Sequence, residues 1–299
     1  MKKYLLILSI FTLFCIGCNI DEPKSYYQKE STEQNVIKQD KLILELQELN
    51  DSLIQSKQTV TRGRFKDFFK KICNIVVADV KGGFSGATIG NKVGGKVGAW
   101  ICGVVTAIGD SFKAGVTEFS RATMKGLSIE EIEAAYSQTI YKDIDISEAE
   151  YIKLNANLKI PTEFKYTTEM GRLHNLTLTC IESGDYSLTN YKTQLTKPEI
   201  LCINCEEFRS FYNTDRVFNI EEAIINSTKE EQVIQFFIEA FLEYPEDSED
   251  VTQLINNYID KIEADNSISP EKRESIYYAL SIAAYSTEYW KEKYETLNL

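Results

Sequence analysis

The residues of this chain most able to do chemistry are its cysteines. Cys202 and Cys205 have the spacing of a redox motif or of half a zinc site. After position 18 the sequence has no second pair with this spacing and no thioredoxin-like strand–helix pattern around the first. The sequence has five cysteines after position 18, because Cys73, Cys102 and Cys180 precede this pair. Five is an odd number, so at least one cysteine stays reduced or pairs between chains. We expect no metal site, and a candidate disulfide joins Cys180 to Cys202 or Cys205.

Other candidate catalytic groups are scarce or scattered. The single histidine, His174, excludes multi-histidine metal sites and is interpreted as a structural residue. The 45 acidic residues are interpreted as solvated helix surface, because no pattern pairs two of them as acid and base. A net charge of −12 argues against nucleic acid as the main partner, since phosphate binding needs a basic surface. We therefore expect no enzymatic activity and no cofactor.

Residues 1–18 are predicted to be an export signal that ends in a lipidated cysteine, Cys18. Lys2 and Lys3 precede an apolar run, Tyr4 to Ile16, that is too short to span a bilayer comfortably. The Ile16-Gly17-Cys18 ending resembles the cleavage box of bacterial lipoproteins, which implies a lipid on Cys18. The alternative is a plain secretory signal with a chance cysteine.

A polar tether, residues 19–35, comes next. Its two early acidic residues resemble the tether that sends Bacteroidota lipoproteins to the cell surface. The resemblance implies a lipid-anchored protein at the outer membrane or cell surface of a Gram-negative bacterium, with membrane lipid as its first partner.

Charge and glycine divide the rest of the chain unevenly. Residues 62–126 carry a net charge of +7, and residues 127–299 carry −18. Ten of the fifteen glycines also lie between Gly82 and Gly115. Two composition shifts on one segment set it apart as a candidate membrane or partner surface.

This basic part, residues 65–126, is predicted to form an amphipathic helix and then a glycine-zipper hairpin. Residues 65–80 place aromatic and aliphatic side chains on one face of the helix and lysines away from it. Such a helix can lie at an anionic lipid interface. Alternatively, it can pack its apolar face on the protein core while its lysines extend to solvent. Glycines then recur every fourth residue from 82 to 98, which lets two helices approach closely. The candidate membrane and zipper residues are Phe65, Phe68, Phe69, Gly82, Gly86, Gly90, Gly94, Gly98 and Gly103.

Two interpretations of the hairpin remain open. It could insert into a membrane as an oligomer, or its glycines could simply pack two helices in a soluble core. The apolar run 98–108 is too short for a standard membrane span. A phosphate-binding loop is rejected, because the segment lacks the required GK[ST] ending.

The flanking parts are predicted to be helical as well. Within residues 36–64, a leucine stripe from Leu42 to Leu53 indicates a short helix that either docks on its own domain or self-associates, and a linker follows. Residues 127–299 are predicted to form an acidic helical bundle, with capping boxes such as Thr228 with Glu231. Only residues 176–181 show a short strand-like alternation. The expected fold is mainly α, with little or no β.

Three stretches together resemble a known group: Met170–Asn175 with Leu178, Ser267–Trp290, and the glycine segment. They are similar to Bacteroidota lipoproteins with bacteriocin-like glycine-rich segments. In that group the glycine segment usually comes last, whereas here it comes first. The resemblance brings no catalytic residues.

Arg62 and Arg64 are candidate cleavage sites ahead of the basic helix. This layout resembles lipoprotein bacteriocins of gut Bacteroidales, which are activated by arginine-specific cysteine proteases. It implies a surface lipoprotein with a membrane-interacting glycine zipper, released by cleavage; an accidental dibasic linker is the alternative. The competing function is a structural or adhesion lipoprotein whose zipper only packs a soluble core.

Overall fold

The described residues of this chain are helical. A computed structural model describes residues 40–57, 64–119, 128–142, 157–184, 206–213 and 228–297. They hold eight α-helices, one short 3-10 helix and no strand, which confirms the predicted mainly α bundle. The predictions for the signal peptide, Cys18 and the tether lie outside these residues.

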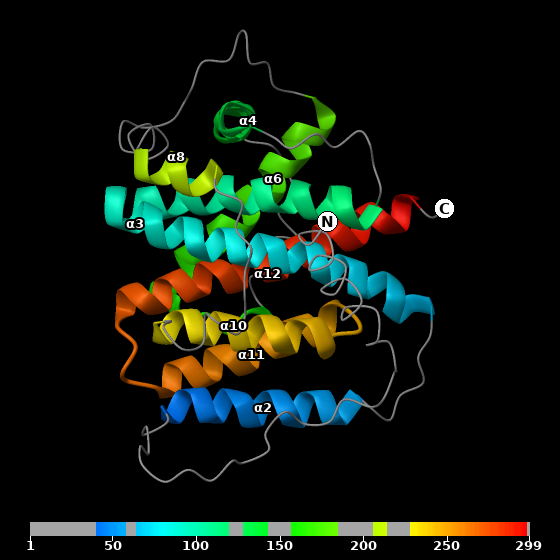
Figure 1. Ribbon diagram of the computed structural model, residues 1–299, viewed down its shortest axis with the longest axis vertical. Coiled ribbons are helices and arrows are strands. Elements are labelled where there is room, and N and C mark those ends of the chain that lie inside the picture. The colour runs from blue at the N-terminus through cyan, green and yellow to red at the C-terminus, as the bar shows by residue number, and fades with distance from the viewer. Residues whose placement is uncertain are drawn as a thin grey trace, which may run out of the picture. The chain divides into compact units, whose positions relative to one another are not determined.

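The helices stack in layers around α3 and α12 (Figure 1). On one side of this pair lie α10 and α11, with α2 beyond them, and on the other lie α4, α6 and α8. The elements are α2 (Lys41–Lys57), α3 (Arg64–Phe119), α4 (Ile129–Lys142), η1 (Thr162–Thr167), α6 (Thr168–Ser183), α8 (Glu206–Asn213), α10 (Lys229–Glu243), α11 (Ser248–Ala264) and α12 (Pro270–Leu297).

Helix α12 is the central helix. Every residue from 274 to 287 is buried, so it is covered on all sides, as expected for a core helix. It begins at Pro270 as predicted, where the Ser269 carbonyl accepts from the N–H groups of Lys272 and Arg273 at 3.1 and 3.0 Å. Its most extensive contacts are with α3, and the next most extensive with α6.

Helix α3 is a hairpin of two arms, residues 64–93 and 96–119. Gly94 and Gly95 between them leave the helical conformation, and Gly95 has a φ of +60°, which glycine adopts without strain. The two arms run side by side in Figure 1. The predicted helical hairpin is therefore present, with its turn inside the glycine segment.

The glycines of the first arm lie directly against the backbone of the second. A methyl group added to them would meet a carbonyl oxygen of the other arm: that of Thr106 at 2.7 Å from Gly82, of Cys102 at 2.3 Å from Gly86, and of Gly98 at 2.0 Å from Gly90. Any side chain there would force the arms apart. The predicted row from 82 to 98 is thus divided between the two arms, with Gly94 in the turn.

The amphipathic start of α3 packs into the core. Phe69, Ile72 and Val76 are buried, whereas Lys70 and Lys71 are exposed. In this structure the apolar face is covered by the protein itself, so of the two predicted environments the core with extended lysines is the one observed. The side chains of Phe65 and Phe68 lie outside the described residues.

The capping boxes place two helix starts where the sequence predicts them. Thr228 and Glu231 bond reciprocally at the start of α10, as do Ser128 and Glu131 at α4. The strand-like alternation at 176–181 does not form a strand. It lies within α6, which ends at Gly184 in the left-handed conformation. Leu176, Thr177 and Leu178 are all buried, so the alternation of residue types does not correspond to an alternation of burial.

Gly86→Ala should lower the free energy of unfolding by about 1–3 kcal/mol, because its methyl group overlaps the second arm. Without that overlap, alanine would stabilise the helix by up to ~1 kcal/mol. Urea denaturation measures the change. The control Lys92→Ala, at an exposed position near the turn, should stay within about 0.5 kcal/mol of the parent. Equal stability of Gly86→Ala and Lys92→Ala would contradict the close contact of the arms.

Candidate functional site: the glycine hairpin and its buried polar cluster

The outer faces of the hairpin are covered by other helices. Gly83 of the first arm faces Ile282 of α12, and Gly103 of the second arm faces Met170 of α6. Most residues from 72 to 90 and all from 98 to 109 are buried or half-buried. The sequence left open whether the glycine helices are buried or exposed, and the structure buries them.

The second arm is fastened to α12 and η1 by aromatic and polar contacts. The Trp100 indole donates to the Tyr278 hydroxyl at 2.7 Å, and this hydroxyl donates to Glu274 at 2.6 Å. Lys96 donates to the Tyr166 hydroxyl at 2.9 Å and lies 4.4 Å from the centre of that ring. The hydrogen bond to Tyr166 raises the pKa of Lys96 despite some desolvation, and Glu274 adds to it by charge. Moving this arm would break all of these contacts.

The turn of the hairpin meets solvent. Lys92, Gly95 and Lys96 are exposed there, and Val93 and Val97 are 37% and 38% exposed. Among the described residues, the other large apolar side chain exposed to this degree is Leu44 of α2. Val93 and Val97 differ from it in lying together, beside two lysines. This end of the hairpin is therefore accessible to an external surface.

Inside the bundle, four helix segments meet at a fully buried polar cluster. Asp79 of the first arm accepts a short hydrogen bond from the Ser286 hydroxyl of α12. His174 of α6 places its Nε2 atom 3.7 Å from the carboxyl of Asp79. Ser111 of the second arm and Trp290 of α12 also lie at this carboxyl. Asp79, His174 and Ser286 are all 0% exposed.

Neighbouring groups fix the form of His174. Asn175 donates its amide to the Tyr285 carbonyl at 2.8 Å, so its side-chain oxygen is turned towards His174 Nδ1, 3.1 Å away. The proton of a neutral imidazole then belongs on Nδ1, and Nε2 faces Asp79 as an acceptor. That arrangement suits an Asp79 that keeps its own proton.

Burial controls the charges of this pair. It raises the pKa of Asp79 well above its usual range, against the opposing effect of the polar groups of Ser286, Ser111 and Trp290. It also lowers the pKa of His174 to about 4, against the effect of the hydrogen bond that His174 donates to Asn175. Burial therefore favours the uncharged form of both groups, and His174 is uncharged at neutral pH.

These three residue types also occur in nucleophilic triads, but the arrangement here is different. In a triad the serine bonds to the histidine and the aspartate orients the histidine. Here Ser286 bonds to Asp79, and Nε2 of His174 makes no hydrogen bond within the described residues. With all three side chains buried, no substrate can reach the hydroxyl. The cluster joins helices and does not form an accessible reaction site.

Sequence reasoning missed Asp79 and Ser286, although Asp79 carried a signal. It stands among Ile75, Val76 and Val80 on the apolar face of the first arm, where a charged residue is unexpected. An acid on a buried face indicates a polar partner from elsewhere in the chain. No local pattern shows that the partner is Ser286.

Several other candidate residues lie outside the described residues, so the structure does not test them. Cys180 is buried in α6, and Cys202 and Cys205 lie outside the described residues, so the disulfide stays a prediction. Arg62 also lies outside them, and Arg64 begins α3. In the described part of the chain, no set of three metal-binding side chains converges, and no helix is both long and apolar enough to span a membrane.

Comparison with known proteins gives no match among protein families, curated proteins or solved structures. Its function must therefore be argued from its own residues.

His174 should remain neutral over most of the physiological pH range. Because it is the single histidine, an untagged chain should give one set of imidazole NMR signals that titrates near pH 4. Unfolded protein should titrate near 6.5. Its folded pKa is the lower one, so His174 makes the fold less stable as the pH falls from 6.5 towards 4. A native midpoint above 6.5 would mean that His174 and Asp79 form an ion pair instead.

Asp79→Asn should stabilise the fold at neutral pH, by about 1–3 kcal/mol, because an amide needs no proton to be uncharged. It can still accept from Ser286 and donate towards His174. The pKa of Asp79 is higher in the folded than in the unfolded parent. Asp79 therefore lowers the stability of the parent above pH 3.8, increasingly as the pH rises, and has no such effect below pH 3.8. The gain should therefore shrink towards pH 4 in denaturation series. A variant less stable than the parent at pH 7 would contradict the destabilising effect of burying the Asp79 carboxyl.

Proposed function

We propose that this chain is an exported, lipid-anchored protein that acts on membranes through its α3 hairpin. The observation that carries the proposal is the way the two arms meet. They pack through glycine backbones, so their larger apolar side chains point outwards, where other helices cover them. Such a hairpin is a preformed unit whose apolar exterior suits a lipid environment once the covering helices move away.

The exposed turn supports the same function. Lys92 and Lys96 are suited to anionic headgroups, and Val93 and Val97 to the acyl boundary beneath them. A lipid on Cys18 would hold this surface near a membrane throughout. The proposed location is the outer membrane or cell surface of a Gram-negative bacterium.

Cleavage at Arg62 or Arg64 is the proposed release step. It would give the first arm a new N-terminus at or near its first residue, Arg64. The first arm would then no longer be covalently joined to α2, and it could leave α12 more easily. This is the bacteriocin-like function that the sequence suggests.

Dye leakage from vesicles of phosphatidylethanolamine and phosphatidylglycerol tests the proposal. The full chain without its signal peptide should cause little leakage when intact, and at least tenfold more after treatment with an arginine-specific protease. The Arg62→Gln/Arg64→Gln variant, treated in the same way, should remain inactive. Absence of leakage from intact and cleaved parent alike would exclude the membrane function.

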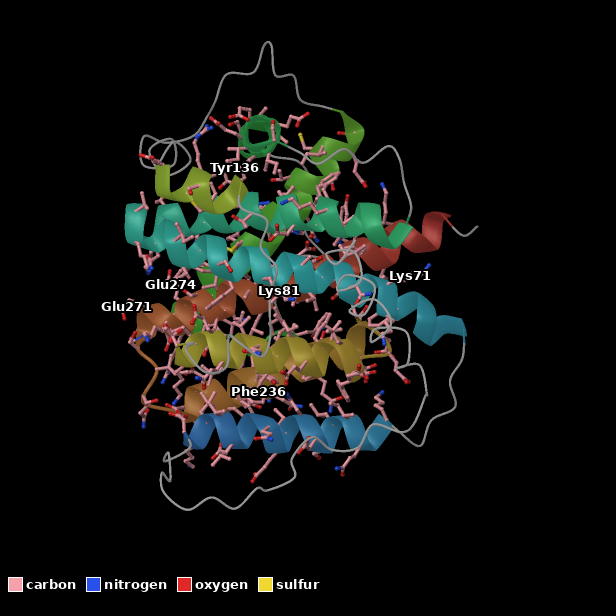
Figure 2. All side chains as sticks on the ribbon, viewed as in Figure 1. Lys71, Lys81, Tyr136, Phe236, Glu271 and Glu274 are labelled. Carbon is pink, nitrogen blue, oxygen red and sulfur yellow. The ribbon has the colours of Figure 1, made fainter. Side chains whose placement is uncertain are left out.

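The alternative is a structural or adhesion lipoprotein in which the hairpin only packs the core. Asp79 and Lys81 favour it, because a carboxyl and an amine inside the first arm are costly in hydrocarbon. Lys81 lies on the first arm in Figure 2, where burial lowers its pKa against the charge of Asp110. Under this alternative neither intact nor cleaved protein permeabilises vesicles.

A further inference from the structure

Helix α2 occupies a distinctive position in the chain. It lies between the N-terminal segment and the candidate cleavage sites, yet it packs mainly against α10 and α11 (Figure 1). A cut between α2 and α3 therefore breaks the chain without touching the contacts of α2.

We propose that α2 is a docking helix that keeps the cleaved protein attached to its own lipid-anchored N-terminus. The inference rests on the anchor and cleavage of the proposed function. The docking partner is the face formed by α10 and α11 of the same chain.

The centre of this contact is apolar, with one buried polar residue. Leu42 and Leu46 are 2% and 0% exposed, and Leu49 and Leu53 pack against the same core. Asn50 is buried beside them. It donates to the Phe236 carbonyl of α10 at 2.9 Å and accepts from the Tyr258 hydroxyl of α11 at 2.8 Å. Figure 2 labels Phe236 on the side of α10 towards α2. One amide thus bonds to both helices, which fixes the register of α2.

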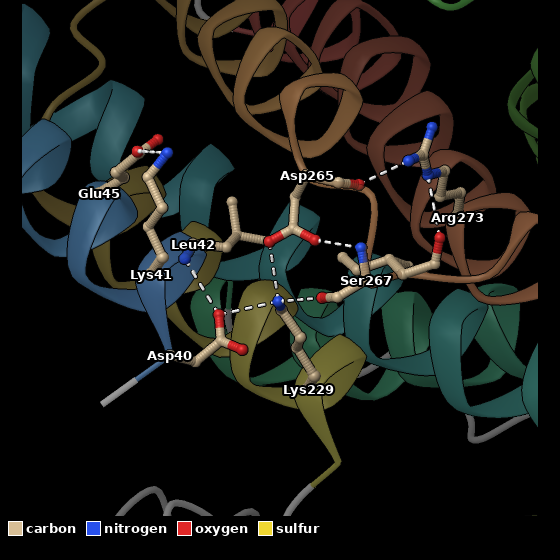
Figure 3. Close-up of polar contacts among 9 residues, drawn as sticks. Asp40, Lys41, Leu42, Glu45, Lys229, Asp265, Ser267 and Arg273 are labelled. Atoms are coloured by element: carbon tan, nitrogen blue, oxygen red, sulfur yellow. Dashed lines mark hydrogen bonds and ion pairs between the residues drawn. The ribbon is translucent and has the colours of Figure 1, made fainter. Parts of the chain in front are cut away.

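Ion pairs hold the start of α2. Asp40 accepts from the Leu42 N–H at 3.0 Å as a cap and pairs with Lys229 of α10 at 2.8 Å. The same lysine pairs with Asp265 at 2.8 Å and donates to Ser267 (Figure 3). The pKa of Asp265 falls to about 2 because its bonds to Lys229 and Ser267 outweigh desolvation by burial. The start of α2 is thereby joined to α10 and to the connection between α11 and α12.

The end of α2 is held as well. Lys57 pairs with both carboxyl oxygens of Asp250 in α11, at 2.8 and 3.0 Å, and lies over the Tyr244 ring. Glu45 and Lys261 pair at 3.3 Å between these two ends. A helix with a buried apolar stripe, a buried amide and ion pairs at both ends is held without its covalent connection to α3.

The test uses the chain from residue 19, with a specific protease site placed in residues 58–63 and an affinity tag at the N-terminus. After cutting, the α2 fragment should stay with the rest of the chain in size-exclusion chromatography and in affinity pull-down. Separation of the parent fragments at micromolar concentration would overturn the docking proposal.

Asn50→Ala should speed release of the cut fragment about 10- to 100-fold, because the Phe236 carbonyl and Tyr258 hydroxyl lose their partner. Glu48→Ala, on the exposed face of α2, is the matched control and should release at the parent rate. Circular dichroism of the uncut chains checks that each variant folds. Equal release from Asn50→Ala and Glu48→Ala would overturn the assigned contacts.

Leakage by the same cut samples is measured separately. Retention of α2 without leakage would leave the docking proposal standing and exclude the membrane function. Leakage together with loss of α2 would support the membrane function and overturn the docking proposal.

Discussion

The close approach of the two α3 arms is the constraint on which the fold depends. Gly82, Gly86 and Gly90 place bare backbone against carbonyl oxygens of the other arm. Because no side chains separate the arms, the larger apolar residues of both project outwards and need cover from α12, α6 and α10. Glycine is costly inside a helix, by about 1 kcal/mol relative to alanine, and tight packing offsets that cost.

The buried cluster adds a polar constraint at the same hairpin. Asp79, His174 and Ser286 connect the first arm to α6 and α12 at a point no solvent reaches. Burying the ionisable side chains of Asp79 and His174 makes the fold less stable than burying apolar side chains at the same positions would. Because the energetic cost of burying Asp79 and His174 changes with pH, we expect the stability of the fold to depend on pH.

Local patterns predicted the helices well and their environments poorly. Capping residues and the Ser269-Pro270 start mark single chain positions, so the starts of α10, α4 and α12 follow from sequence. The leucine stripe of α2 showed an apolar face but left docking and self-association open. Whether that face meets α10 or a second copy depends on residues distant in sequence, such as Phe236 and Tyr258.

The sequence by itself determined that the chain is helical and that a glycine hairpin lies within its basic segment. Both follow from local spacing: fourfold glycine repeats and caps act within a few residues of one another. Only the tertiary structure decided that the hairpin is buried, that Asp79 lies beside His174, and that α2 packs against both α10 and α11. These contacts join residues far apart in the chain, and burial changes the energy of each charge and apolar face after the helices have packed.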